Sequence, residues 1–319
     1  MARETCITGI EALVVALAAG GWRILGPVEH DGAILYRELT GTQDLPRGRV
    51  DAQEAGHYRL EDGDPGRWFD FVVGPQSWKP WLMPPRRRLW SAGRTGDGFE
   101  IVQDAPEDWP PTVFLGVRPC EIAALGHLDR VFAEGAGRDP DYVRRREGTL
   151  FVAVQCARAA PTCFCASTGT GPRAEAGFDL ALTELDGRFL LEIGTERGRA
   201  AVAGLERRPA TAGDLDEAQA RSAAAAGQQT RALHPRAGEI SRAREHPHWD
   251  DVAARCLGCA NCTLACPTCF CSDVEDVTDL AGETAERWRV WDSCFGLDFS
   301  RLHGGEVRRS TRSRYRQWL

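Results

Sequence analysis

Cysteine spacing is the feature of this sequence that points most directly to chemistry. Four cysteines form a C-x2-C-x2-C-x3-C run that a proline follows at once: Cys256, Cys259, Cys262, Cys266 and Pro267. Such a run is the bacterial ferredoxin pattern for a [4Fe-4S] cluster, since one tight loop brings several thiolates onto one iron–sulfur cube. Zinc is the alternative because C-x2-C pairs also bind zinc, but the three-residue final gap and the proline favour iron.

The fourth cysteine of the run could serve a different cluster from the first three. In ferredoxins with two clusters, the fourth cysteine of each run ligates the other cluster. Cys266 would then belong to a second cluster, yet the 319 residues contain no second C-x2-C-x2-C run. Either the chain stops short of its partner motif, which the sequence favours, or further cysteines nearby complete the coordination: Cys269, Cys271 and Cys294.

A short internal repeat predicts an additional site. The residues PTCFC at 161–165 recur identically at 267–271, and the first copy contributes Cys163 and Cys165. Cys120 and Cys156 each follow an apolar run that reads as a strand. Because ligands collect at the carboxyl ends of strands in α/β sheets, we expect an additional [4Fe-4S] site on these four thiols. The alternative is that some of them are buried structural thiols.

The elements that must position these cysteines follow from the apolar pattern. The runs 113–117 and 150–154 flank a helical pattern that begins near Pro119, which predicts a parallel βαβ unit. The same reasoning predicts further elements: a helix at 8–19 and strands at 22–25, 33–39, 69–73, 178–185 and 189–193. The prolines in 77–88 predict a segment without regular structure, which is either a packed connecting loop or a site that touches a partner subunit.

The length of 319 residues suggests about two domains. We expect an α/β domain at 1–209 that contains the additional iron–sulfur site, followed by a helical linker at 210–246. A small, mainly α-helical ferredoxin-type domain, which we expect to be truncated, then follows at 247–319.

Composition narrows the class of protein. The net charge of −7 argues against nucleic acid as a partner, and the sequence has no apolar run long enough for a membrane span. Six of the 12 cysteines fall within residues 256–271, which indicates metal ligation in a reducing cytoplasm rather than a disulfide framework. No serine–histidine–aspartate order or carboxylate pair suggests a catalytic residue. Lys79 is the only lysine among the 39 basic residues, and composition assigns it no role.

A set of motifs spread over nearly the whole chain carries a family resemblance: SWKP at 77–80, GVRPC at 116–120, both PTCFC copies, CLGCANC at 256–262, WDSC at 291–294 and RYR at 314–316. Together they resemble the iron–sulfur subunit family that comprises the beta subunit of cytosolic NADP-linked sulfhydrogenases and the corresponding iron–sulfur subunit of anaerobic sulfite reductase. That family joins an α/β domain to a ferredoxin-type domain with two cysteine runs. The present sequence matches the first run and ends about where the second should begin.

The resemblance implies a non-catalytic electron-transfer subunit with one or two [4Fe-4S] clusters. Its partners would be a flavin-containing reductase subunit that carries FAD and NAD(P), and a catalytic hydrogenase or sulfite reductase subunit. Docking would use the exposed face around the clusters, where Trp249, Phe270 and Trp291 supply apolar contact. The alternatives are an oxidoreductase that binds its own flavin, a redox or iron sensor, and a zinc-stapled interaction module.

Overall fold

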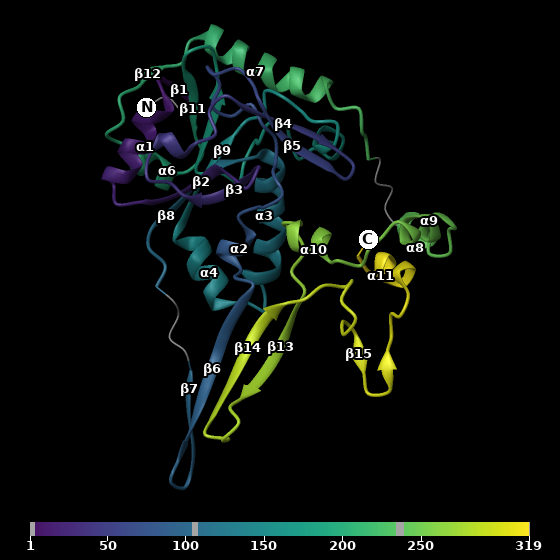
Figure 1. The fold of residues 1–319 in the computed structure, drawn as a ribbon. Coiled ribbons are helices and arrows are strands. Elements are labelled where there is room, and N and C mark those ends of the chain that lie inside the picture. Colours follow the sequence, from purple (N-terminus) through teal and green to yellow (C-terminus); the bar gives the residue numbers. More distant parts are fainter. Residues whose placement is uncertain (1–3, 104–107, 234–238, 319) are drawn as a thin grey trace. The chain divides into compact units, whose positions relative to one another are not determined.

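The computed structural model describes residues 4–103, 108–233 and 239–318, and the chain divides into two compact units. Unit 1 combines Met1–Trp78 with Asp108–His234, and unit 2 combines Lys79–Glu107 with Pro235–Leu319. Figure 1 shows the elements of both units, with colours that follow the sequence from the N-terminus to the C-terminus. The expected boundaries differ from this division, because they assign 79–107 to the first domain. Residues 234–238 of the expected linker lie outside the described residues.

Unit 1 is built on an eight-stranded mixed sheet with the order β12-β1-β11-β10-β9-β8-β2-β3. Parallel pairing joins its four central strands: β2 (Arg23–His30), β8 (Thr112–Val117), β9 (Thr149–Val154) and β10 (Leu180–Glu184). Antiparallel pairing adds the outer strands: β3 (Ala33–Glu38), β11 (Phe189–Ile193), β1 (Glu4–Ile7) and β12 (Arg208–Pro209). The predicted α/β class of this domain is confirmed.

The central strands are apolar because both of their faces are covered. Every residue of β8 and β9 is buried, which is typical of parallel strands with helices on the two sides of the sheet. Alternate residues such as Val113 and Val152 pack into the same core cluster as Leu13 and Leu17 of α1 (Ile10–Ala19).

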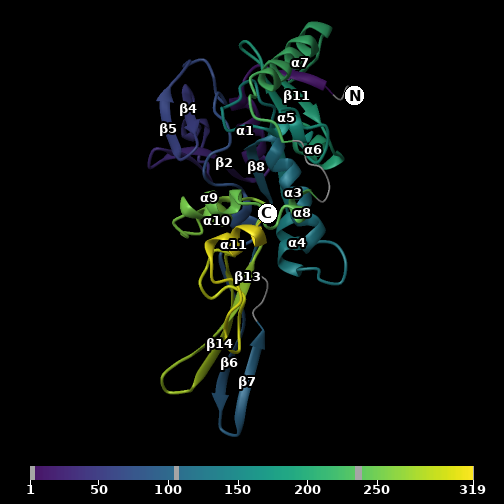
Figure 2. The ribbon, with the colours of Figure 1, turned by 90° about the vertical axis from the view of Figure 1, so that its right-hand side faces the viewer.

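The remaining elements of unit 1 surround this sheet (Figures 1 and 2). They are the hairpin β4 (Arg49–Glu54) and β5 (His57–Asp62), the short helix η1 (Thr42–Asp44), and the helices α3 (Pro119–Phe132), α4 (Pro140–Glu147), α5 (Cys165–Thr168), α6 (Glu196–Ala201) and α7 (Ala212–Gly227). Helix α3 lies between the parallel neighbours β8 and β9 in the chain, so the predicted βαβ unit is confirmed.

The expected strand at 69–73 was wrong, and the hydrogen bonds of this segment explain why. Its backbone groups bond to side chains of other elements instead of to a neighbouring strand. The Val72 amide donates to Asp51 Oδ1 at 2.7 Å, and the Phe69 carbonyl accepts from the Arg118 guanidinium at 2.9 Å. The segment is therefore satisfied without joining a sheet.

Unit 2 is organised around a four-stranded antiparallel sheet with the order β13-β14-β6-β7. Its strands are β6 (Arg86–Thr95), β7 (Gly98–Gln103), β13 (Ser272–Thr278) and β14 (Thr284–Trp291). The pairing of β14 with β6 explains why residues 79–107 group with the C-terminal segment. The expectation of no regular structure at 77–88 was wrong, because α2 (Lys79–Leu82) and the start of β6 lie there.

The other elements of unit 2 are short. They are α8 (Glu239–Arg242), α9 (His248–Ala254), α10 (Asn261–Ala265), α11 (Thr311–Trp318) and the small hairpin of β15 (Arg301–Leu302) and β16 (Gly305–Glu306). The structure thus has the helices expected in the C-terminal domain and adds the β13–β14 hairpin to them. Among the described residues, no helix has the length and apolar character that crossing a membrane requires.

Candidate metal centre

Four cysteines of unit 1 lie together beyond the carboxyl ends of two parallel strands. Cys120 is in the first turn of α3, directly after β8, and Cys156 follows β9. The loop after β9 contributes the other two, and we call the set the sheet-edge thiols: Cys120, Cys156, Cys163 and Cys165. Burial and the charge on Glu121 raise the pKa of Cys120, and negative charge on each of the other three thiols raises it further. The structure therefore brings the predicted set together.

Burial dominates the electrostatics of the sheet-edge thiols. It raises the pKa of Cys120 well above its usual value, and it raises that of Cys156 to about 11 although the Arg118 guanidinium lowers it. Thiolates, not thiols, ligate iron. Iron bound by these four sulfur atoms would therefore displace the protons that burial holds on them.

Groups around these sulfur atoms fit a bound anionic cluster. Arg118 is only 2% exposed and hydrogen-bonds to Cys156, so it places positive charge at the site. The Gln229 Nε2–H donates to Cys165 Sγ at 3.2 Å. A Cβ at Gly171 would stand 2.9 Å from the same sulfur, so glycine permits this close approach. Such donors moderate the charge on cluster ligands.

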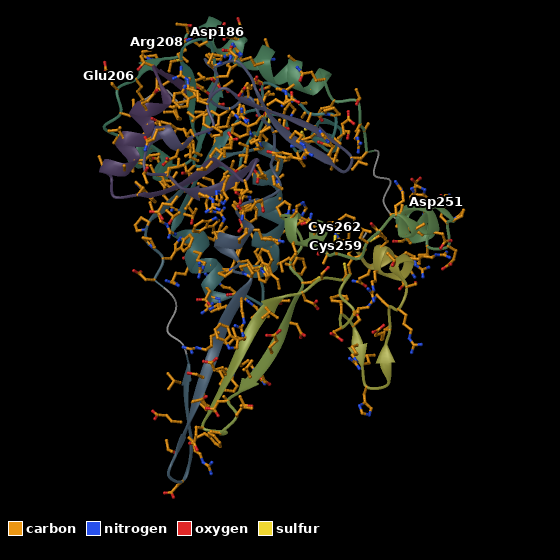
Figure 3. All side chains as sticks on the ribbon, viewed as in Figure 1. Asp186, Glu206, Arg208, Asp251, Cys259 and Cys262 are labelled. Carbon is orange, nitrogen blue, oxygen red and sulfur yellow. The ribbon has the colours of Figure 1, made fainter. Side chains whose placement is uncertain are left out.

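The ferredoxin-type run of unit 2 is a more exposed loop. Its first three cysteines, which we call the loop thiols, are Cys256, Cys259 and Cys262, and Figure 3 labels the last two. Gly258 has a φ of +66°, and its amide donates to Cys256 Sγ at 3.3 Å. Charge on Cys256 and on Cys259 raises the pKa of Cys262, after the larger effect of burial. The three sulfur atoms therefore share one region of the loop.

The fourth cysteine of the run lies with the cysteines that the sequence left unassigned. A cavity of about 340 Å³ is lined by four sulfur-bearing residues that we call the cavity thiols: Cys266, Cys269, Cys271 and Cys294. The Cys269 thiol donates to the Cys266 sulfur, which raises the pKa of Cys269 and lowers that of Cys266 to about 5. Burial, followed by charge on Cys271, raises the pKa of Cys294 to about 11.

Lys79, to which composition assigned no role, lies against the segment that carries two of the cavity thiols. Its side chain is buried, and Nζ donates to the carbonyls of Thr263, Cys266 and Cys269 at 3.1, 2.8 and 3.2 Å. Nζ also lies 4.2 Å from the centre of the Trp291 ring. Burial lowers the pKa of Lys79, whereas charge on Cys269 opposes that effect. The sequence feature that could have drawn attention to Lys79 is that it is the only lysine in a chain whose other 38 basic residues are arginines.

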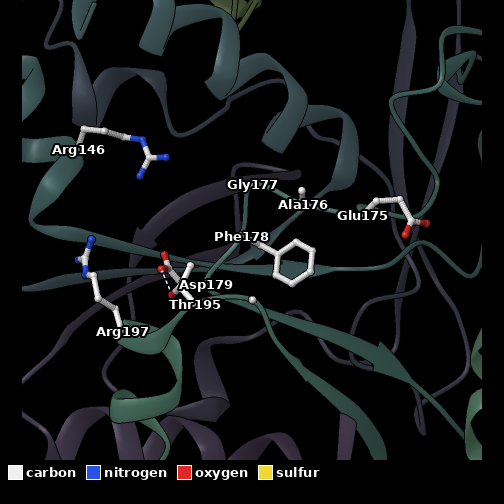
Figure 4. A pocket seen from close by; sticks show the side chains of 9 residues that line it. Arg146, Glu175, Ala176, Gly177, Phe178, Asp179, Thr195 and Arg197 are labelled. Atoms are coloured by element: carbon white, nitrogen blue, oxygen red, sulfur yellow. Dashed lines mark hydrogen bonds between the residues drawn. The ribbon is translucent and has the colours of Figure 1, made fainter. Parts of the chain in front are cut away.

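Two features of unit 1 lie outside the thiol groups. Cys6 is buried beside Leu190 and Ala218, as a structural thiol is expected to be. A cavity of about 380 Å³ is lined by Arg146, Arg197 and the Asp179–Thr195 pair, and it contains no cysteine (Figure 4). Across the part of the chain that the structure describes, no three histidine, cysteine or acidic side chains are placed to hold a single metal ion.

Comparisons with known proteins agree with the cysteine pattern. The family model of a 4Fe-4S dicluster domain matches residues 255–319, which contain the loop thiols and the cavity thiols. The chain is similar to sulfhydrogenase 2 subunit beta of Pyrococcus furiosus, with 34% identity over 297 residues that cover 91% of this chain and 78% of that protein. No solved structure matches. The predicted 4Fe-4S character of the C-terminal domain is therefore confirmed.

Proposed function

The chain belongs to the family of sulfhydrogenase beta subunits, and from this premise we propose that it is an electron-transfer subunit without a catalytic residue of its own. Its [4Fe-4S] clusters would relay electrons between a flavin-containing subunit and a catalytic subunit. The observation that carries the proposal is the cysteine run from Cys256 to Cys266, which lies inside the matched dicluster domain.

The proposal assigns two groups of ligands. Cys256, Cys259, Cys262 and Cys266 serve the dicluster domain, and the sheet-edge thiols hold an additional cluster in unit 1. Support for the second group comes from its geometry, because four thiols from three parts of the chain meet beyond the ends of β8 and β9. Chance burial of free cysteines does not by itself explain such convergence.

The role of the protein is to position the clusters and to determine how readily they accept electrons. A bound [4Fe-4S] cluster takes up and releases one electron at a time. Around the sulfur atoms, Arg118, Gln229 and the Gly258 amide supply positive charge or hydrogen-bond donors. These groups favour the more negative, reduced state, and burial opposes them. Potentials are therefore set by residues of this chain.

We propose partners of the kind that the family resemblance implies. They are a reductase subunit with FAD and NAD(P), and a catalytic hydrogenase or sulfite reductase subunit, all in the cytoplasm. Of the expected docking side chains, Phe270 is 43% exposed, whereas the Trp249 indole is bonded to the Ala243 carbonyl and Lys79 lies over Trp291. Phe270 is thus the most exposed of the three expected docking side chains.

Reductive titration of the full chain tests the relay role. The protein is purified without oxygen, reduced stepwise with dithionite, and followed by visible absorption and electron paramagnetic resonance. We expect a brown chromophore that bleaches in one-electron steps and returns when a one-electron acceptor is added. A chain that carries a flavin and no reducible cluster would contradict the proposal in favour of an enzyme with its own cofactor.

A further inference from the structure

One edge of the four-stranded sheet of unit 2 carries exposed apolar side chains. The sheet has the order β13-β14-β6-β7, so β7 is one of its two edge strands and β13 is the other (Figure 1). Phe99 and Ile101 of β7 are 61% and 70% exposed, and Val102 is exposed as well. An edge strand presents unpaired backbone groups, and apolar side chains leave such an edge open to pairing with another strand.

We infer that β7 pairs antiparallel with β7 of a second copy of this chain, which joins the two sheets into one of eight strands. The inference goes beyond the proposed relay function and does not depend on the clusters, because no cysteine takes part in the contact. It rests on the difference between the two edges, on the residue pattern of β7, and on how such an assembly closes.

The two edges differ in charge. All seven residues of β13 are exposed, and three of them are acidic: Asp273, Glu275 and Asp276. Charged side chains are a common means by which an edge strand avoids pairing with another chain. In contrast, the six residues of β7 include a single charge, on Glu100. An acidic or basic partner strand would find little complementary charge along β7, whereas an apolar strand fits it, and β7 itself is such a strand.

Symmetry limits the register of this pair. Residues directly opposite in an antiparallel pair lie on the same face, and side chains alternate between faces, so the two-fold axis must pass beside a residue rather than between two. An axis at Glu100 would place two carboxylates directly opposite each other, which is destabilising. An axis at Ile101 places Ile101 opposite its own copy and Glu100 opposite Val102. The inference commits to this second register.

The face that carries Ile101 supports the same register. Phe99 lies on this face too, because it is two residues from Ile101. With the axis at Ile101, Phe99 of one copy lies diagonal to Ile101 of the other, within reach of an aromatic side chain. On β6, the residue opposite Ile101 is the small, buried Ala92. Four large apolar side chains, two from each copy, can therefore form one stripe across the contact.

Pairing through β7 also explains why assembly would stop at two copies. A two-fold contact uses the same surface on both subunits, so it closes once it is made. Both β7 strands become central in the joined sheet, and its outer edges are the two copies of β13. Those edges carry the acidic side chains that disfavour further pairing. The expected product is a dimer rather than an open fibre.

Sedimentation equilibrium of the full chain, purified without oxygen, tests the inference. We expect an equilibrium between monomer and dimer. Ile101→Lys should raise the dissociation constant of the dimer at least about tenfold, because apolar contact is lost and two positive charges face each other across the axis. Val274→Lys is the matched control, since Val274 is an exposed valine of the opposite edge strand, and it should leave the constant unchanged.

Two variants of one residue test the register without relying on a folding control. Val102→Lys places a positive charge opposite Glu100 of the other copy, whereas Val102→Glu places a second negative charge there. We expect the lysine variant to dimerise at least about fivefold more tightly than the glutamate variant.

The inference is overturned by a chain that stays monomeric at every soluble concentration. It is also overturned if Ile101→Lys leaves the dimer intact, if Val274→Lys disrupts it, or if the two Val102 variants dimerise equally. Iron content is measured on the same samples and should be equal in all of them. A dimer without iron would contradict the relay function and leave the inference standing.

Discussion

Single residues set the charge around the cysteines, and Lys79 is the clearest example. The only lysine of the chain is buried against the segment that carries Cys266 and Cys269, where three backbone carbonyls accept hydrogen bonds from its ammonium group. An arginine could not replace it without a larger space for its planar head group. The residue therefore combines two roles, because it fixes the loop and it supplies positive charge.

Removal of that charge should shift a cluster potential. In Lys79→Met the reduced cluster, which carries the more negative charge, loses a nearby cation. We therefore expect one midpoint potential to fall by on the order of 60 mV, which corresponds to a tenfold change in the equilibrium constant of a one-electron reduction. Redox titration with equal iron content is the measurement. Arg138→Met, at an exposed position of unit 1, is the control and should leave all potentials unchanged. A Lys79→Met protein with unaltered potentials would limit Lys79 to a structural role.

The sheet-edge thiols provide a second test at single positions. Cys163→Ala should remove about four iron per chain and one paramagnetic signal, because a cube with three thiolates left in a buried site is held weakly. Cys6→Ala is the matched control, since this thiol is buried away from the group. If Cys163→Ala retained its iron, the unit 1 thiols would be structural.

The helices and strands determine which cysteines lie close together, and part of that arrangement could be predicted from the sequence. The apolar runs that became β8 and β9 predicted the parallel pair, and hence the meeting of Cys120 with Cys156. The β13–β14 hairpin was missed because β13 is fully exposed and rich in acidic residues, so no apolar alternation marks it. It forms by backbone pairing within a sheet that also recruits residues 86–103. That long-range pairing left no local signal, and the cavity thiols depend on it.

Packing of α3 against the sheet should determine the stability of unit 1. Leu128 of α3 is fully buried, so Leu128→Ala should lower the free energy of unfolding by about 2–5 kcal/mol. Chemical denaturation of the full chain, followed by circular dichroism, measures the change. Leu215→Ala in α7 removes a side chain that is 41% exposed and should alter stability by less than about 0.5 kcal/mol. Equal effects of the two variants would argue against the packing described for α3.

For the molecule as a whole, the two units differ in what stabilises them. Unit 1 has an extensive apolar core between its sheet and helices. In unit 2, Thr263 is the only buried residue between 256 and 271, so apolar packing gives this segment little stability. Ligation of a cluster can supply what packing does not, because a group that binds only the folded state stabilises it.

Removal of iron should therefore open unit 2 selectively. We expect the chelator-treated, iron-free chain to be cut within residues 256–271 by a protease of broad specificity, while the sheet of unit 1 stays intact. Limited proteolysis with mass spectrometry of the fragments is the measurement, and the iron-loaded chain is the control. Identical fragments at equal rates from both forms would show that ligation does not stabilise the segment.

The central claim is that the cysteines bind iron–sulfur clusters through which electrons pass. Iron, sulfide and zinc quantified per chain after anaerobic purification of the full protein test it most directly. We predict iron and sulfide in equal amounts, about four of each for every occupied site, and little zinc. Zinc without sulfide would contradict the account.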